Sequence, residues 1–80
     1  MKFALYYYDA CPFCQRVLRV LPDLKVEVEK RNVLTNAGYR QQQYAATGRT
    51  TVPVLRLEDE SGKESWMFES ADIIRFLQAQ

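Results

Sequence analysis

Apolar residues recur along the chain in two patterns, one typical of strands and one typical of helices. Residues 2–8 form an apolar, aromatic-rich run without a helix breaker, which predicts a buried strand. Apolar side chains then return at i, i+3, i+4 and i+7, which is the spacing of one helical face. They are Cys14, Val17, Leu18 and Leu21. The pattern stops at Pro22-Asp23, so we expect this helix to end there.

The middle of the chain contains signals for a second strand and a second helix. Residues 26–29 alternate valine with glutamate, which indicates a strand with one face in water, at or near the edge of a sheet. Thr35 or Asn36 can cap a helix that runs to about Ala46. Gly48 supplies the residue at which such a helix closes. This helix is rich in glutamine and only weakly amphipathic.

The last third of the chain predicts a hairpin and a closing helix. Residues 54–57 and 65–68 are the two expected strands, and residues 59–62 form the turn, with Gly62 in the left-handed conformation. Ser70 is expected to cap the final helix, which has Asp72 in its first turn. The order β-α-β-α-β-β-α predicts an α/β protein: one domain over residues 1–80, with a four-stranded mixed sheet flanked by three helices.

Composition and charge exclude several classes of function. The 80 residues carry a formal net charge of +1, which gives no basic surface for nucleic acid or for anionic membranes. The apolar runs are too short to span a membrane, and the start of the chain lacks the apolar segment of a secretion signal. We therefore expect a monomeric, cytoplasmic protein in a reducing environment.

The candidate chemistry lies in Cys11-Pro12-Phe13-Cys14, which contains both cysteines of the chain. With two cysteines and no histidine, the chain alone cannot close a zinc site that needs four ligands. An inert buried pair is the remaining structural interpretation. Pro12 favours redox chemistry, because it suits the first helical position and places Cys11 at a helix start, where the thiolate is favoured. Cys14, one turn into the helix, is expected to stay protonated and close enough to attack a disulfide at Cys11.

Three stretches, in this order along the chain, resemble glutaredoxins of the thioredoxin superfamily. Residues 8–14 are similar to the family's Cys-Pro-Tyr-Cys site, with Phe13 in place of the tyrosine. Residues 48–55 match the family's Thr-Val-Pro segment, in which the proline is cis; here it is Pro53. Residues 67–74 look less like the Gly-Gly-x-Asp-Asp of compact glutaredoxins than like the Glu-Ser of glutathione transferase N-terminal domains.

The resemblance implies a thioredoxin-like fold and a glutathione-dependent dithiol oxidoreductase. Cys11 would be the nucleophile, and Cys14 the resolving thiol that forms a Cys11–Cys14 disulfide. The enzyme would reduce protein disulfides and glutathione mixed disulfides. Glutathione would serve as a co-substrate, with no metal and no tightly bound cofactor.

The resemblance also implies a set of residues around glutathione. They are Cys11, Phe13, Thr51, Val52, Pro53, Glu69 and Ser70. The Val52 backbone would pair with the cysteinyl part of glutathione. The helix start at Ser70 would hold the γ-glutamyl carboxylate, and Glu69 would accept from the adjacent ammonium. The candidates for the glycine carboxylate are Arg16, Arg40, Gln43 and Arg49, of which Arg49 and Gln43 are expected to lie nearest to the site.

One departure from the family pattern and three alternatives accompany this interpretation. Tyr8 and Asp9 stand where the family usually has a lysine or arginine, and a nearby acid opposes thiolate formation. The chain is alternatively the N-terminal glutathione-binding domain of a transferase-like protein. It is alternatively a glutathione-bridged dimer with an iron–sulfur cluster on Cys11, which Pro12 disfavours. A tyrosine among residues 6–8 is a further candidate for activating glutathione.

Overall fold

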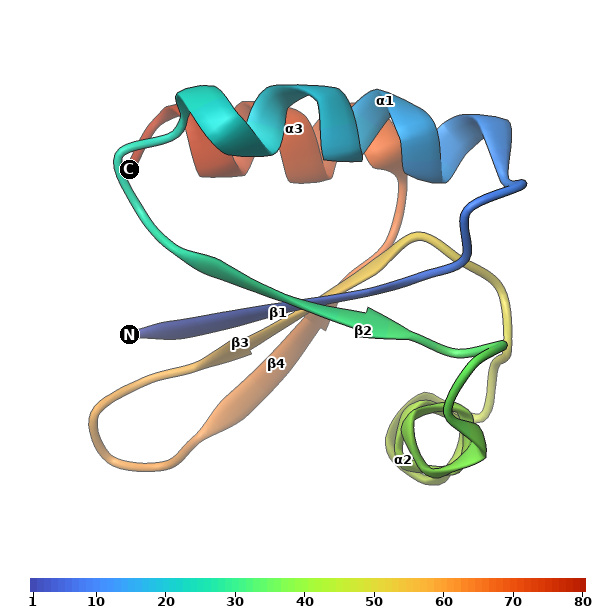
Figure 1. The fold of residues 1–80 in the computed structure, drawn as a ribbon. Helices are drawn as coiled ribbons and strands as arrows, with labels where there is room; N and C mark the ends of the chain where they lie inside the picture. Colours follow the sequence, from blue (N-terminus) through green and yellow to red (C-terminus); the bar gives the residue numbers. More distant parts are fainter.

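The chain forms a four-stranded sheet with helices on both faces (Figure 1). The computed structural model describes all 80 residues. The strands are β1 (Lys2–Tyr7), β2 (Val28–Asn32), β3 (Val54–Glu58) and β4 (Glu64–Met67). The helices are α1 (Pro12–Val20), α2 (Ala37–Thr47) and α3 (Ser70–Gln78), and a short 3₁₀ turn over Leu21–Asp23 follows α1. None of these helices is both long and apolar enough to cross a membrane.

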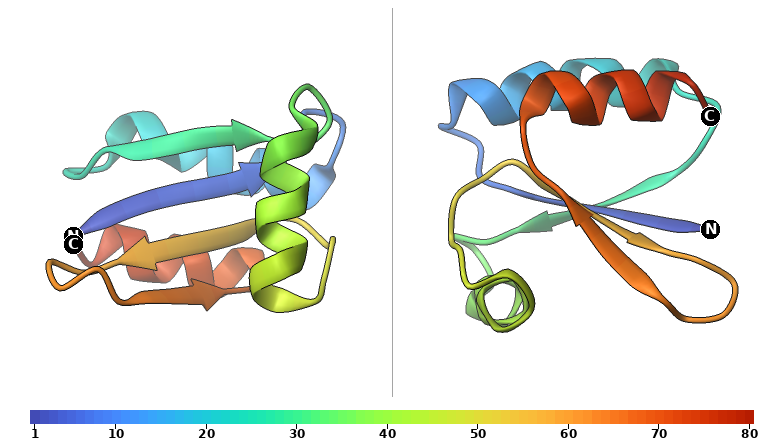
Figure 2. Two further views of the ribbon diagram at one scale, coloured as in Figure 1. Left: turned by 90° about the horizontal axis from the view of Figure 1, so that it is seen from below. Right: turned by 180° about the vertical axis from the view of Figure 1, so that it is seen from behind.

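The strands lie in the order β2-β1-β3-β4, so β1 is central and β2 is an edge strand. β1 pairs parallel with β2 and antiparallel with β3, and β3 pairs antiparallel with β4. The two views of Figure 2 show α1 and α3 on one face of the sheet and α2 on the other. The predicted fold class and the predicted edge position of the second strand are both confirmed.

Alternation along β1 divides the core into two layers. Phe3 and Leu5 face α1 and α3, where they join a cluster of buried apolar residues. Its other members are Val17, Leu55, Leu57, Ile73 and Leu77. Ala4 and Tyr6 face the opposite side, where a smaller cluster also contains Val33 and Val54. The half-buried ring of Tyr39, from α2, packs against this second cluster.

Helix α2 begins and ends at the residues that the sequence indicates. The Asn36 side chain accepts from the Gly38 N–H at 2.9 Å, which satisfies one of the free donors at the helix start. At the other end, Gly48 adopts a left-handed conformation with φ of 70°, and its N–H donates to the Tyr44 carbonyl. Figure 2 shows that α2 crosses the strands near one end of the sheet and leaves the rest of that face without a helix.

Several predicted boundaries differ from the structure. β1 ends at Tyr7 rather than at residue 8, and β4 spans Glu64–Met67 rather than residues 65–68. The second strand begins at Val28 rather than at residue 26, because Val28 is the first residue to pair with β1, opposite Phe3. The alternating side chains of residues 26–29 therefore start before the backbone pairing does. Ser70 is the first residue of α3 and not its cap. Glu69 occupies the cap position, and its side chain makes no capping hydrogen bond.

The fold brings three separate loops to one end of the molecule. α1 and α3 both start at this end, and the loop that precedes β3 passes beside them (Figures 1 and 2). The loop between β1 and α1 ends at Cys11, and the connection from β4 to α3 contains Glu69. The structure therefore gathers the three sequence motifs into one region.

Candidate thiol site

Cys11 occupies the cap position of α1, with Pro12 at the first helical position. The Cys11 Sγ accepts a hydrogen bond from the Cys14 backbone N–H at 3.3 Å, so the sulfur lies at the positive end of the helix dipole. A free N–H group at this point stabilises negative charge on sulfur. The predicted placement of Cys11 at a helix start is confirmed.

The loop before β3 lies against the Cys11 sulfur. The peptide bond between Val52 and Pro53 is cis, as the resemblance implies. The Cys11 thiol donates to the Val52 carbonyl, with 3.8 Å between sulfur and oxygen. Pro53 is buried, whereas Val52 is half-buried. The Val52 backbone is therefore next to the reactive sulfur, although it lies far from Cys11 in the sequence.

Cys14 lies in the first turn of α1 and is more deeply buried than Cys11. Both cysteines are free thiols, and Cys14 is completely buried, whereas Cys11 is 5% exposed. Burial raises the pKa of Cys14 from 9.0 to about 12, and a hydrogen bond with Cys11 adds to the increase. At neutral pH, Cys14 is therefore held as a thiol, which matches the protonated state expected from its position in the helix.

Glu69 and Ser70 form the start of α3 at the same end of the molecule. Glu69 has φ of 62° and ψ of 110°, and it is the one residue other than glycine with a positive φ. Such a conformation is strained in a residue with a Cβ, and strained residues concentrate at binding and catalytic sites. The Glu69 side chain is exposed, whereas Ser70 is 8% exposed. The N–H groups of the first turn of α3, which have no partners within the helix, lie at the same helix start as these two side chains.

Arg49 and Gln43 occupy different surroundings from each other. Arg49 is exposed and stacks on the ring of Phe68, with 4.8 Å between its guanidinium carbon and the ring centroid. This places Arg49 beside the residue that precedes Glu69. The Gln43 side chain is fully buried, and its Nε2 donates to the Thr51 carbonyl at 2.7 Å. We therefore withdraw the interpretation of Gln43 as a surface ligand for the glycine carboxylate, because its amide faces the protein interior.

The remaining candidates are more exposed. Phe13 is 54% exposed beside Cys11, and the guanidinium carbon of Arg16 lies 5.2 Å from the centroid of its ring. Arg40 and Thr51 are also exposed. One contact that holds the loop before α1 has no signal in the sequence: Gln15 Nε2 donates to the Asp9 carbonyl at 2.6 Å. A polar side chain on the first turn of a helix is too common to single out from sequence.

The structure places Tyr6 on the opposite face of the sheet. Its hydroxyl accepts from Arg31 at 2.6 Å and donates to Gln42 at 3.2 Å, and its ring is buried beside α2. Tyr6 therefore cannot activate a thiol bound at Cys11. No group of three or more histidine, cysteine, aspartate or glutamate side chains is arranged to hold a metal ion.

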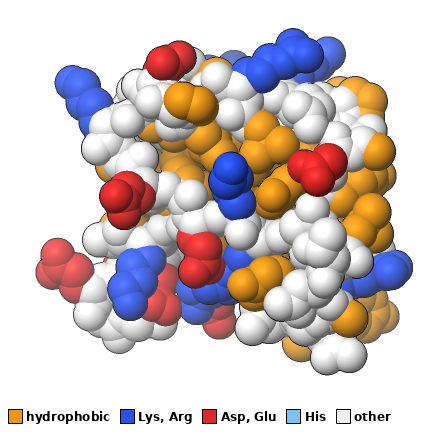
Figure 3. All heavy atoms as spheres, in the orientation of Figure 1, with side chains coloured by type: hydrophobic (Ala, Val, Ile, Leu, Met, Phe, Trp, Pro, Cys, Tyr) orange, Lys and Arg blue, Asp and Glu red, His pale blue; other side chains and the backbone are white.

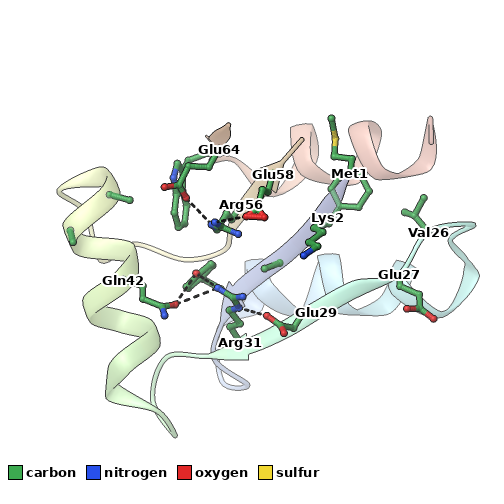
Figure 4. Close-up of a pocket in the computed structure, with 16 residues that line it drawn as sticks. Met1, Lys2, Val26, Glu27, Glu29, Arg31, Gln42, Arg56, Glu58 and Glu64 are labelled. Carbon is green, nitrogen blue, oxygen red and sulfur yellow. Dashed lines mark hydrogen bonds and ion pairs between the residues drawn. The ribbon is translucent and has the colours of Figure 1, made fainter. Parts of the chain in front are cut away.

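A hollow of about 1030 Å³ in the surface lies on the α2 face and is lined by neither cysteine (Figure 4). Arg56 bridges Glu58 at 3.1 Å and Glu64 at 2.7 Å, and Arg31 pairs with Glu29. The hydrogen bond to Glu64 raises the pKa of Arg56. These ion pairs lie on the part of the sheet that α2 leaves open and line this hollow. On the side of the molecule drawn in Figure 3, charged side chains of both signs are scattered among apolar atoms.

Comparison with known proteins identifies the family. A family model described as "Glutathione S-transferase, N-terminal domain" matches residues 5–80. No curated protein matches the chain. Among solved structures, the trimeric glutathione transferase TDR1 of Leishmania is 31% identical over 94% of this chain, with a TM-score of 0.72. A maleylacetoacetate isomerase from Anaeromyxobacter dehalogenans, with dicarboxyethyl glutathione and citrate in its active site, is 25% identical over 98% of this chain, with a TM-score of 0.53.

The chain is shorter than these two relatives. It spans 17% of the Leishmania transferase chain and 34% of the isomerase chain. It spans 92% of thioredoxin 1 from Thermosipho africanus, which is 21% identical over 99% of this chain, with a TM-score of 0.64. This last likeness shows the fold alone. The family match covers nearly the whole chain, so the chain belongs to the family of glutathione S-transferase N-terminal domains, which have a thioredoxin-like fold.

Proposed function

We propose that this chain is a glutathione-dependent thiol–disulfide oxidoreductase with Cys11 as its nucleophile. The observation that carries the proposal is the asymmetry of the two thiols. Cys11 sits at a helix start next to the Val52 backbone, and Cys14 is buried behind it with a pKa raised to about 12 by burial. Thiol–disulfide exchange needs one thiol that ionises and a second that can resolve the product. The family supports glutathione as the small thiol.

The first step is attack by the Cys11 thiolate on a mixed disulfide between glutathione and a protein. A bond forms between the Cys11 sulfur and the glutathione sulfur, and the protein thiolate leaves and takes a proton from water. A second glutathione thiolate then attacks the glutathione sulfur on Cys11. Oxidised glutathione leaves and the Cys11 thiolate is restored, so each protein thiol released consumes one glutathione thiol, and the disulfide bond ends in oxidised glutathione.

Cys14 offers a second route for resolving the intermediate. A Cys14 thiolate attacks the Cys11 sulfur, expels glutathione as a thiolate, and leaves a Cys11–Cys14 disulfide that two further glutathiones reduce. This route requires Cys14 to lose its proton, and the raised pKa makes that loss rare at neutral pH. We therefore expect the route through a second glutathione to dominate at neutral pH, and the Cys14 route to gain weight as the pH rises toward the pKa of about 12.

Glutathione would lie along the three loops at this end of the molecule. The Val52 N–H and C=O would pair with its cysteinyl unit, beside Thr51 and Pro53. The first turn of α3 would hold the γ-glutamyl carboxylate with the help of the Ser70 hydroxyl, and Glu69 would accept from the ammonium. Arg49 stacks beside this second region, which favours a role at the γ-glutamyl end over the glycine end.

Two cysteine variants test the assignment. Cys11→Ser is expected to abolish the reduction of glutathione mixed disulfides, whereas Cys14→Ser is expected to retain it and to lose only the dithiol route. The measurement is the glutathione-coupled reduction of a mixed disulfide, with thioredoxin reductase as the alternative source of electrons. An active Cys11→Ser protein and an inactive Cys14→Ser protein would reverse the roles.

A second candidate is the glutathione-binding domain of a transferase-like protein. The observation that favours it is that the chain spans only 17% of a glutathione transferase and 34% of a maleylacetoacetate isomerase that has dicarboxyethyl glutathione bound in its active site. Conjugation of glutathione to 1-chloro-2,4-dinitrobenzene, measured beside mixed-disulfide reduction, separates the two. Reduction without conjugation supports the oxidoreductase, and conjugation without reduction supports the transferase.

A further inference from the structure

The most unusual residue of α2 is a buried glutamine. Gln43 is the only residue of this helix that is fully buried, with 0% of its surface exposed. Helices that pack on a sheet normally bury apolar side chains at such positions. Gln43 also leaves one of its polar atoms, Oε1, buried without a hydrogen-bond partner. A methionine of similar length would fill the same space without that penalty, so packing alone does not explain the amide.

The other polar atom of Gln43 holds the loop that passes Cys11. Its Nε2 donates to the Thr51 carbonyl at 2.7 Å. One turn later in α2, the Thr47 hydroxyl lies 2.8 Å from the Gln43 carbonyl, and the Arg49 N–H donates to this hydroxyl at 3.1 Å. Two side chains of α2 therefore hold the loop that leads from α2 to Pro53, and the contact made by Gln43 is the one nearest to the thiol site.

The contact at Thr51 fixes more than one carbonyl. The Thr51 C=O and the Val52 N–H belong to the same planar trans peptide, so they point in opposite directions. With the carbonyl held toward α2, the N–H is directed away from α2. The Val52 carbonyl in turn lies 3.8 Å from the Cys11 sulfur. The Val52 N–H is therefore oriented through the contact of Gln43 with Thr51, and the Val52 carbonyl is oriented by its contact with Cys11.

We infer that Gln43 is a positioning residue, which aims the Val52 N–H at the cysteinyl unit of glutathione by holding the Thr51 carbonyl. This inference rests on the proposed function, because it assigns a determinant of affinity within the same site. Gln43 acts through Thr51 and does not touch the ligand. Its loss weakens glutathione binding, and it leaves Cys11 and its reactivity toward other thiols intact.

The test is Gln43→Met, with Gln41→Met as the matched control on the exposed side of the same helix. We expect Gln43→Met to raise the KM for glutathione five- to tenfold, with kcat at saturating glutathione within twofold of wild type. Reduction by dithiothreitol, which has no peptide groups to pair with Val52, stays within twofold. The melting temperature does not fall, because two effects offset each other. The variant loses the hydrogen bond to the Thr51 carbonyl, but it also removes the buried Oε1 that has no partner. Gln41→Met matches wild type in every measurement.

An equal loss with glutathione and with dithiothreitol, or no change in the KM for glutathione, overturns the inference. If Gln43→Met does not fold, nuclear magnetic resonance of the wild-type protein replaces it. Titration with unreactive S-methylglutathione is then expected to shift the Val52 amide and the Gln43 side-chain amide together, and to leave the Gln41 side chain unmoved. An unmoved Gln43 amide refutes the inference. Failure of the wild-type protein to bind S-methylglutathione refutes the proposed function itself.

Discussion

The buried thiol of Cys14 links the chemistry of the site to the stability of the fold. Its pKa is raised from 9.0 to about 12, first because burial removes the thiolate from water. An unfolded chain loses this proton near pH 9, whereas the folded protein keeps it until about pH 12. The contribution of Cys14 to stability is therefore complete below pH 9 and is lost as the pH rises through this window.

We predict that the stability difference between wild type and Cys14→Ser shrinks as the pH rises from 9 toward 12. The serine hydroxyl does not titrate in this range, so the variant lacks this part of the pH dependence. Urea unfolding at pH 7, 9 and 11, under a non-thiol reductant, measures it. A difference that stays constant over the three pH values would mean that Cys14 titrates alike in the folded and unfolded protein.

Glu69 combines a charge and a strained backbone at one position, and two substitutions separate them. Glu69→Gln keeps the strain and removes the charge. We expect it to raise the KM for glutathione several-fold, with little change in melting temperature and no change in reduction by dithiothreitol. The lost charge-assisted hydrogen bond is worth about 1–2 kcal/mol.

Glu69→Gly is the complementary change, because glycine adopts φ of 62° without a Cβ clash. It is expected to increase the free energy of unfolding by about 1 kcal/mol, since relief of strain exceeds the added entropy of the unfolded chain. The glutathione defect should match that of Glu69→Gln. A destabilised Glu69→Gly protein would show that the Glu69 side chain supports the fold.

Among the elements, α2 depends on Gly48 for its end. Gly48 has φ of 70°, and a Cβ built there meets nothing within 4 Å, so a substitution tests backbone conformation alone. We predict that Gly48→Ala lowers the free energy of unfolding by about 1 kcal/mol. Gly48→Asn should lose less, because asparagine tolerates the left-handed conformation. Equal losses for the two variants in urea unfolding would point to another cause.

The same helix shows what the sequence can and cannot predict. Asn36 and Gly48 act locally, so the ends of α2 were predictable to within a residue. The start of β2 was not, because alternation of side chains begins at residue 26 whereas pairing depends on where Phe3 meets Val28. In the site, the residue pattern itself predicts the places of Cys11 and Cys14 at the start of a helix, whereas the role of Pro53 was implied by the resemblance to the family's Thr-Val-Pro segment. The burial of Gln43 was not predictable, because a buried amide in a glutamine-rich helix has the same sequence signature as an exposed one.

At the scale of the whole molecule, the α2 face of the sheet is only partly covered by a helix. Arg56 and its ion pairs lie on the part that α2 leaves open (Figure 4). Glu58 and Glu64 are directly opposite each other across β3 and β4, and Arg56 pairs with both. Like charges opposite each other on neighbouring strands are destabilising. The arginine therefore offsets a repulsion between two strands.

We predict that Arg56→Met lowers the free energy of unfolding by about 1 kcal/mol, and that adding Glu64→Gln restores part of the loss. Urea unfolding of wild type, both single variants and the double variant measures the coupling. Arg75→Met is the control, because its ion pair with Asp72 is exposed on α3 and should contribute almost nothing. Strict additivity of the two substitutions would show that the Arg56–Glu64 pair makes no contribution.

The central position of β1 has a consequence for the chain while it is being made. Synthesis delivers Cys11 and Cys14 early, but β3 and α3, which complete the layer over Cys14, come from the last third of the chain. Until β3 joins β1, the core around Cys14 is incomplete, and an oxidant or electrophile can reach a thiol that is completely buried in the finished fold. The protection of Cys14 by burial is therefore acquired only when the sheet closes, and a nascent chain that has been modified at Cys14 must bury the modified side chain or fail to pack.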